Sequence, residues 1–291
     1  MTKNRTFLPR QLLARLEQPF SPKNFRIVVQ MPPSPRLPIA PTTQRPNVLP
    51  SKSQPLTMKR IIFATASIIG PFFLAAPVQA VSQRHLEQLR TTNKCVNCDL
   101  VRADLVSTNL SGADLSGANL TGANLFGANL KDADLRRASL GNASLSGASL
   151  GGAFLSGAFL KDAFLRGSNL QGANLTSANL SGANLSRATL VDAVMNRANF
   201  SGAYLFDANL KNGNLQEANF SSAYLEGADF NGANLQKGNF KNADLRNSDF
   251  SEADLRGANL GGANLGGANL FNANLCDATM PDGSKSRQGC Q

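Results

Sequence analysis

Residues 113–127 read ADLSGANLTGANLFG, three copies of a five-residue pattern that continues far along the chain. Every fifth residue from Leu100 to Met280 is Leu, Phe or Met, and the register holds without a gap. A small residue, usually Ala, stands two positions before each of these, and the residue between the two is usually Asn or Asp. Such a short fixed period indicates a stacked, quasi-one-dimensional repeat.

Each pentad predicts one short extended face followed by a corner. The large and the small apolar residues are two positions apart, so both side chains point inward while the polar residue between them points outward. The remaining two positions carry pairs such as Ser-Gly, Lys-Asp and Asn-Gly, which favour turns. No single pentad can bury its own Leu, whereas stacked coils of pentads bury all of them in one column.

The spacing of the aromatic residues predicts four faces per coil. The later inward Phe residues recur at intervals of twenty, and the two Tyr residues repeat the same interval at outward positions. A coil of four pentads stacks these Phe residues in two columns on opposite walls, and we expect side chains to fill the interior without a ligand cavity. The predicted core columns include Leu100, Leu120, Leu185, Phe200, Phe220, Phe230, Phe240 and Phe250.

The repeat strongly resembles the pentapeptide repeat family, whose motif A(D/N)LXX is matched by residues 113–117 (ADLSG) and residues 123–127 (ANLFG). The resemblance covers about residues 98–280. It implies an all-β fold, a right-handed quadrilateral parallel β-helix with the Leu and Ala columns inside. The pentads would then stack as about nine coils, roughly 43 Å long at ~4.8 Å per coil.

The chain before the repeat has a different composition. Residues 58–80 read MKRIIFATASIIGPFFLAAPVQA, a basic start, an apolar run and a small-x-small site that ends at Ala80. This layout predicts a signal peptide that is cleaved after Ala80, with an uncleaved membrane anchor as the alternative. Residues 1–57 are basic and hold eleven Pro, which is typical of a disordered segment. We expect translation to start at Met58; a cytoplasmic tail or an organelle transit segment over residues 1–57 are the alternatives.

Both ends of the repeat need a cap, because an open coil exposes hydrogen-bonding edges and core. Residues 81–97 are expected to form the amino-terminal cap, with a short helix over residues 82–90 that carries Leu86 and Leu89 on one side. Residues 281–291, which break the register, are expected to form the carboxy-terminal cap.

The four cysteines lie only at the two ends of the repeat. Cys95 and Cys98 are at its start, and Cys276 and Cys290 are at its end. In the β-helix that the resemblance implies, the two pairs are roughly 40 Å apart, far beyond the ~7 Å Cα limit for a bridge. Disulfides Cys95–Cys98 and Cys276–Cys290 are therefore expected, and oxidation suits an exported protein. A redox or metal site at the CxxC stretch is the alternative.

Few residues point to catalysis. The chain has one His, His85 in the expected cap, and neither a nucleophile elbow nor a phosphate-binding glycine loop. Because nothing suggests paired groups in a concave site, we predict that the chain is not an enzyme and uses no metal or cofactor. The net charge of +10 also belongs to the front of the chain, because residues 1–94 carry +12 and residues 95–291 carry −2. Nucleic acid is therefore not an expected partner of the repeat.

A regular solenoid presents long faces, and these usually serve interactions. Folded on a period of twenty, the sequence gathers outward aromatic residues on one wall, and we take as candidate interface Phe126, Phe164, Tyr204, Phe206 and Tyr224. Phe154 and Phe159 point outward on two other walls, and scattered surface aromatics are the alternative interpretation. The predicted function is a non-enzymatic interaction or structural scaffold with an unidentified protein partner.

The expected location is outside the cytoplasm, in a periplasm or a thylakoid lumen. Membrane association is not expected once the signal peptide is removed. The sequence does not decide between a monomer and a homodimer. The alternative function is mimicry of duplex DNA, by which the gyrase-protecting members of the resembled family act through a strongly acidic surface. Residues 98–280 carry thirteen basic and sixteen acidic groups, which gives a nearly balanced surface instead.

Overall fold

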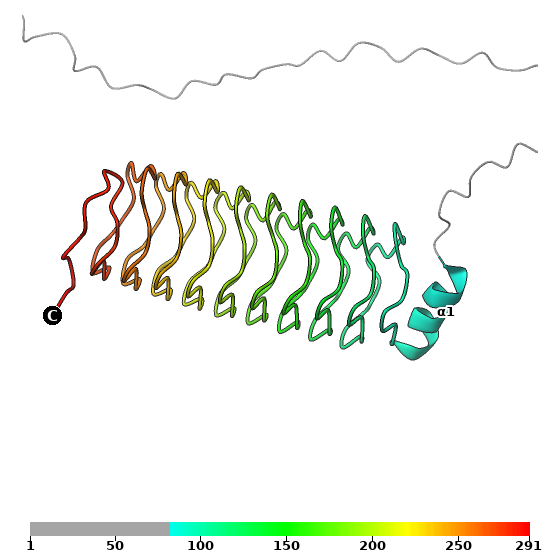
Figure 1. Cartoon of the computed structure of the whole chain (residues 1–291). Helices are drawn as coiled ribbons and strands as arrows, with labels where there is room; N and C mark the ends of the chain where they lie inside the picture. Colours follow the sequence, from blue (N-terminus) through cyan, green and yellow to red (C-terminus); the bar gives the residue numbers. More distant parts are fainter. Residues whose placement is uncertain (1–81) are drawn as a thin grey trace, which may run out of the picture. The chain divides into compact units, whose positions relative to one another are not determined.

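The structure is a computed structural model that describes residues 82–291. One helix, α1, spans Gln83–Thr92, and the chain after it winds into coils that stack along one axis (Figure 1). Parallel bridges join residues twenty apart, from Lys94↔Asp114 to Asn259↔Thr279, so each coil has four walls. The fold is the right-handed quadrilateral parallel β-helix that the sequence predicts, and it begins one pentad earlier than residue 98.

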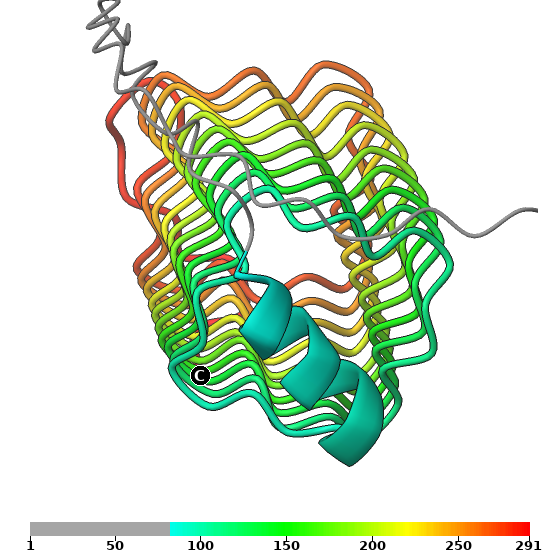
Figure 2. The same ribbon diagram turned by 90° about the vertical axis from the view of Figure 1, so that its right-hand side faces the viewer.

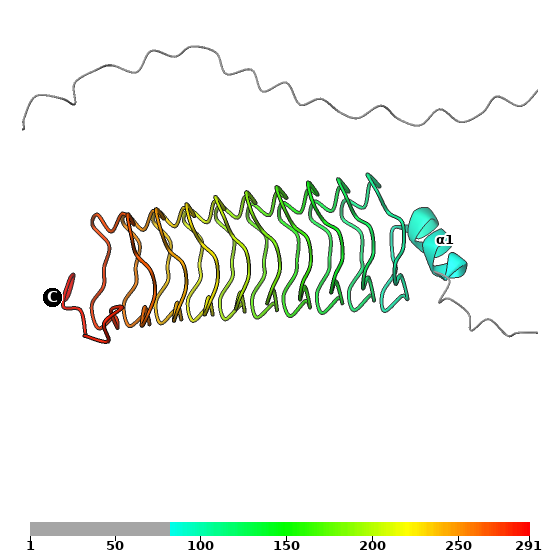
Figure 3. The same ribbon diagram turned by 90° about the horizontal axis from the view of Figure 1, so that it is seen from above.

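We name the four walls after the outward residues of one coil. They are the Tyr204 wall, the Asn209 wall, the Asn214 wall and the Asn219 wall. Seen from above, the coils follow one another along the stack without a break (Figure 3).

The backbone bonds between coils follow one repeated scheme. Leu120 N–H donates to the Ser139 carbonyl of the next coil at 2.7 Å, and Asn119 N–H donates to the Cys98 carbonyl of the previous coil at 2.8 Å. The same offsets recur wall after wall along the stack. An inner coil therefore satisfies its backbone groups through the coils on either side, and only the two ends need other partners.

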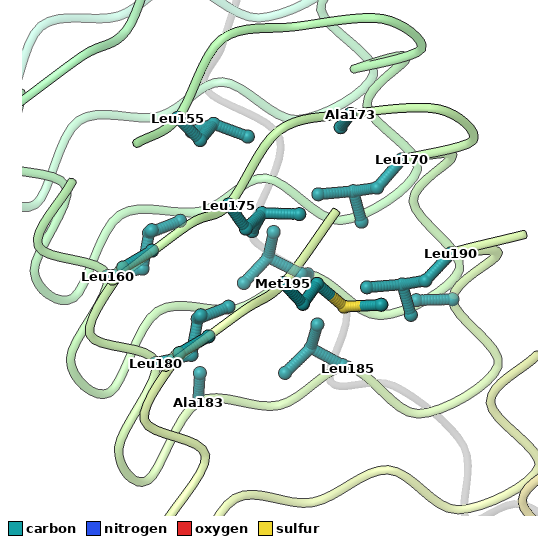
Figure 4. Packing of buried hydrophobic residues seen from close by; sticks show 14 of the residues in the cluster. Leu155, Leu160, Leu170, Ala173, Leu175, Leu180, Ala183, Leu185, Leu190 and Met195 are labelled. Atoms are coloured by element: carbon teal, nitrogen blue, oxygen red, sulfur yellow. The ribbon is translucent and has the colours of Figure 1, made fainter. Parts of the chain in front are cut away.

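The inward columns fill the interior. Figure 4 shows Leu170, Leu190 and Met195 pointing into the space that the walls share. The opening inside the ribbons in the end view of Figure 2 is thus occupied by side chains. The core residues predicted from the sequence are all 0% exposed, namely Leu100, Leu120, Leu185, Phe200, Phe220, Phe230, Phe240 and Phe250.

The Phe residues form the two columns that their spacing predicts. Phe220 stacks on Phe200 and Phe240 with ring centroids 4.8 and 5.0 Å apart, and Phe230 stacks on Phe250 at 4.8 Å. The two columns also meet edge to face across the core, as Phe220 and Phe230 do at 5.8 Å. Both geometries are favourable for aromatic rings.

The corners have one conformation throughout. From Asn97 to Asp277, the second corner residue of every pentad has a positive φ between 51° and 73°. Gly adopts this left-handed region without steric cost, and Asn and Asp tolerate it. Charged residues with long side chains also occupy it, including Arg137 at 57° and Glu217 at 59°, so the corner geometry overrides residue preference.

Helix α1 covers the amino-terminal end of the stack (Figure 2). It follows the N-cap residue Ser82 and ends at Thr92, and the C-cap residue Asn93 is left-handed with φ 55°. Leu86 and Leu89, 7% and 2% exposed, pack on the first coil, as the sequence predicts.

The same helix satisfies part of the first coil's open edge. His85 Nδ1 accepts a hydrogen bond from Asp99 N–H at 3.0 Å, and Thr92 Oγ1 accepts one from Lys94 N–H at 3.2 Å. These donors belong to the Asn219 and Asn214 walls, so the cap serves two of the four walls.

At the other end the chain reverses after Met280, and residues 284–288 return antiparallel along the last coil. Ser286 N–H donates to the Ala278 carbonyl at 2.9 Å, and Leu275 N–H donates to the Gln288 carbonyl at 3.0 Å. We call residues 284–288 the cap strand.

The structure contains two disulfides, in the pairing that the spacing predicts. Cys95–Cys98 is buried, because Cys95 occupies a large-residue position and Cys98 a small-residue position of the core. Cys276–Cys290 ties the end of the chain to the last coil and is partly exposed.

The predicted signal peptide over residues 58–80, with its cleavage site at Ala80, and the segment over residues 1–57 lie outside the described residues. Within residues 82–291, no helix has the length and apolar character needed to cross a membrane.

Candidate functional site on the Tyr204 wall

Three outward aromatic residues of the Tyr204 wall touch one another. Tyr204 and Tyr224 are bridge partners in consecutive coils, and their rings stack almost parallel with centroids 4.9 Å apart. Phe206, at the next corner, lies 6.3 Å from the Tyr204 ring and 6.1 Å from the Tyr224 ring. We call these three residues the aromatic cluster. Tyr204 and Tyr224 are 42% and 43% exposed, so the cluster presents apolar surface to solvent.

The structure does not bring the other two candidate residues into this cluster. Phe164 lies on the same wall and is 52% exposed, but Asn184 stands between it and Tyr204 in the bridge ladder. Phe126 is 54% exposed and lies two coils further away, at the corner position that Phe206 occupies. The contiguous surface is therefore smaller than the sequence predicts, although all five residues belong to one side of the rod.

Other exposed aromatic residues lie apart from the cluster. Phe154 and Phe159, 49% and 55% exposed, are on the Asn214 and Asn219 walls. Phe271 is the most exposed large apolar residue of the described chain, at 67%. It is not among the candidate residues predicted from the sequence, although its corner position directly after Leu270, in a long run of Asn and Gly, is a usable signal.

Ion pairs border the aromatic cluster on its carboxy-terminal side. Arg246 Nη2 lies 2.8 Å from a Glu226 carboxylate oxygen and 2.7 Å from an Asp244 carboxylate oxygen. The hydrogen bond from the Arg246 side chain lowers the pKa of Asp244 below its usual value. One guanidinium is shared by two carboxylates, so this border is polar and carries a single net negative charge.

Carboxylates elsewhere on the walls are held in their ionised form. Hydrogen bonds from the Arg136 side chain lower the pKa of Asp134, and those from Ser251 lower the pKa of Asp249. A general acid at neutral pH needs a raised pKa instead. These aspartates support the corners and are poorly suited to proton transfer.

One group of potential metal ligands occurs among residues 82–291, formed by Cys276, Asp277 and Cys290. Its two sulfur atoms are joined in a disulfide, and neither is a thiolate that could bind zinc. The CxxC pair is likewise joined and buried beneath α1, with Cys95 at 0% and Cys98 at 3% exposure. The structure therefore gives both cysteine pairs a structural role in the caps.

A stack of short coils with one continuous core and outward-facing polar walls defines a β-solenoid repeat protein. Family models for pentapeptide repeats match residues 94–122 and 123–162, and a model for the pentapeptide repeat region matches residues 163–240 and 195–270. The chain belongs to the pentapeptide repeat family.

Solved structures of the same family resemble the chain. HetL, a pentapeptide repeat protein involved in heterocyst differentiation regulation from the cyanobacterium Nostoc sp. strain PCC 7120, is 32% identical; the match covers 70% of this chain and 97% of HetL, with a TM-score of 0.38. A pentapeptide repeat protein from the Arabidopsis thaliana thylakoid lumen is also 32% identical, over 38% of this chain and 71% of that protein, with a TM-score of 0.26.

QnrB1, a plasmid-mediated fluoroquinolone resistance protein, is 20% identical over 62% of this chain and 88% of its own, with a TM-score of 0.38. A comparison with curated protein sequences gave no significant match.

Proposed function

We propose that the chain is a non-enzymatic interaction module that acts outside the cytoplasm, and that a protein partner binds the aromatic cluster on the Tyr204 wall. The observation that carries the proposal is the mutual contact of three outward aromatic rings, of which Tyr204 and Tyr224 are exposed and Phe206 is partly buried. Aromatic residues are enriched in the centres of protein interfaces, where they bury large area. The rigid coils hold Tyr204 and Tyr224 in one arrangement, so binding costs little side-chain entropy.

Two observations support a location outside the cytoplasm. Residues 58–80 have the layout of a signal peptide. All four cysteines of the chain are in disulfides, which persist in oxidising compartments. The similar plant protein comes from a thylakoid lumen, and a lumen or a periplasm is the location that we propose.

The partner surface is tested by placing a photo-crosslinking amino acid at position 204 and recovering the adducts from cells. We expect one prominent adduct, which is lost when Phe206 and Tyr224 are both changed to Ser. Phe154→Ser is the matched control, because Phe154 is similarly exposed on the opposite wall. Equal adduct yield in the cluster variant and the control would remove the aromatic cluster from the proposal.

The location is tested by the mass of the mature protein and by its thiol content. We expect an amino terminus directly after Ala80 and no thiol that reacts with an alkylating reagent before reduction. A mature chain that keeps residues 58–80 and sediments with membranes would support the anchor instead. Reactive thiols in the freshly isolated protein would contradict an oxidising compartment.

DNA mimicry is the weaker alternative for this chain. Its acidic groups are interspersed with basic ones, and Arg246, Arg197 and Arg256 each pair with a neighbouring carboxylate. We expect the mature protein to leave the supercoiling activity of DNA gyrase unchanged, and inhibition or protection in that assay would restore the alternative.

A further inference from the structure

The cap strand covers only half of the carboxy-terminal end. It pairs with the last coil along the Asn214 and Asn219 walls, through groups such as Leu275 N–H and Ala278 carbonyl. On the other two walls, Leu265 N–H and Leu270 N–H have no hydrogen-bond partner within residues 82–291. In every inner coil the equivalent N–H donates to the next coil. We call residues 263–272 the open edge.

The core is also uncovered beside the open edge. Every inward Leu from Leu100 to Leu260 is at most 2% exposed, whereas Leu265 and Leu270 are only partly buried. Phe271, 67% exposed, stands at the corner between the two open walls and the cap. Exposed edges and exposed core at the end of a solenoid favour association with another chain.

The hydrogen bonds give this end the shape of a step, with the cap strand on one half and the open edge on the other. The cap strand adds one strand to its half of the end, so that half extends about 4.8 Å further along the rod than the half that ends at the open edge. A two-fold axis perpendicular to the rod, along the boundary between the halves, places the high half of one copy on the low half of the other. The step is therefore complementary to itself, as a two-fold interface requires.

The cap strand has free backbone groups on its outer side. Lys285 forms an antiparallel bridge with Thr279, but the hydrogen bonds that flank this bridge use the Ser284 carbonyl and Ser286 N–H. The N–H and carbonyl of Lys285 consequently face away from their own coil. They are available to pair with the open edge of a second copy.

The charges of the two halves are also complementary. The cap strand carries Lys285 and Arg287 and has no acidic residue. Near the open edge, Asp249 lies on the Asn209 wall and Glu252 at the corner that follows it, and Asn269 of the open edge donates a hydrogen bond to Asp249 at 3.0 Å. Across a two-fold axis each such attraction occurs twice.

We propose that two copies of this chain join end to end at their carboxy-terminal ends, with the cap strand of each copy covering the open edge of the other. The small cross-section of the rod limits the buried area, so the dimer dissociates on dilution. The resulting particle is a rod of twice the length with both amino-terminal caps outermost.

The association is tested by sedimentation equilibrium of the purified protein over a wide concentration range. We expect a reversible approach to twice the mass of one chain. Zero-length carboxyl–amine cross-linking of a mixture of light and heavy-isotope copies then locates the contact. Mixed-isotope peptides that join Lys285 to Asp249 or Glu252 support the proposal, whereas a strictly monomeric protein, or mixed peptides only from other surfaces, would overturn it.

Charge reversal separates this contact from a general effect on folding. Lys285→Glu with Arg287→Glu, both at exposed positions, should raise the dimer dissociation constant about tenfold, and adding Glu252→Lys should recover part of that loss. The matched control is Arg84→Glu with Arg90→Glu, two exposed residues on α1 at the far end. Equal dissociation constants for the cap-strand variant and the control would contradict the proposed contact.

Discussion

At the scale of single residues, the second corner position of each pentad restricts the sequence through its left-handed backbone conformation. Gly172 has φ +66°, and a Cβ at this position would meet no other atom within 4 Å. The cost of replacing it is therefore conformational and does not arise from a clash. Backbone strain and steric clash usually arise together when a glycine is substituted, and at Gly172 only the backbone strain is expected.

Gly172→Ala should lower the free energy of unfolding by about 1–2 kcal/mol, because Ala is strained in the left-handed region. Gly172→Asn should cost clearly less, because Asn tolerates that region and occupies it at corners such as Asn212. Chemical denaturation followed by circular dichroism measures both. Equal losses for the two variants would contradict the conformational explanation, and a greater loss for Asn would show that space around the corner limits substitution.

The inward Leu positions have a different limit, which is set by burial. Leu185 is 0% exposed at the middle of the stack, so Leu185→Lys places a charge in an apolar core that offers it no carboxylate. We expect a loss of at least about 3 kcal/mol. Leu185→Met is the control and should cost less than about 1.5 kcal/mol, because Met195 already occupies a Leu position in the same core. A folded Lys variant with a near-normal denaturation midpoint would contradict a dry, filled interior.

At the scale of the elements, the two caps differ in how far the sequence predicts them. Leu86 and Leu89 have helical spacing, and α1 lies where that spacing indicates. The cap strand has no such signal, because residues 284–288 read SKSRQ and carry no apolar alternation. It is held by backbone bonds and by Cys276–Cys290, and neither contribution is visible in a hydrophobic pattern.

The two disulfides should differ in their resistance to reduction. Cys95 and Cys98 are buried beneath α1, whereas Cys290 is exposed in the carboxy-terminal cap. Attack by a thiolate requires access to a sulfur atom, so a mild reductant should open Cys276–Cys290 first. Alkylation followed by peptide mass spectrometry measures the order. Simultaneous opening of both bonds, without global unfolding, would contradict it.

Loss of the Cys276–Cys290 bond should also loosen the end of the rod. The bond closes a loop with a sequence separation of 14 residues, and loops of this size contribute about 3 kcal/mol in the chain-entropy model. Hydrogen exchange should rise over the cap strand and the last coil after Cys290→Ser, and should stay unchanged near Cys95. Faster exchange throughout the rod would show that the cap supports every coil.

At the scale of the whole molecule, the period of five predicts the fold because each pentad contacts copies of itself. Phe200, Phe220 and Phe240 could be placed in one column from their spacing alone. The surface was less predictable. Spacing puts Phe164 and Tyr204 on one wall, but whether outward rings touch depends on the intervening residue, and Asn184 separates these two. The repeat pattern of the sequence also does not indicate which protein binds this wall.

The same modularity predicts the effect of removing whole pentads. Deleting residues 171–190 removes one complete coil and keeps every wall in register, whereas deleting residues 171–180 removes half a coil. Both chains keep the inward columns, so we expect both to fold into a shorter rod with a similar circular dichroism spectrum. The half-coil deletion turns all later residues by two walls, and Tyr204 then lies on the side opposite Phe164. If the aromatic cluster alone binds the partner, photo-crosslinking at position 204 persists in both variants. Loss of the adduct only in the half-coil variant would show that the partner also needs Phe164 or Phe126, and would extend the interface along the whole wall.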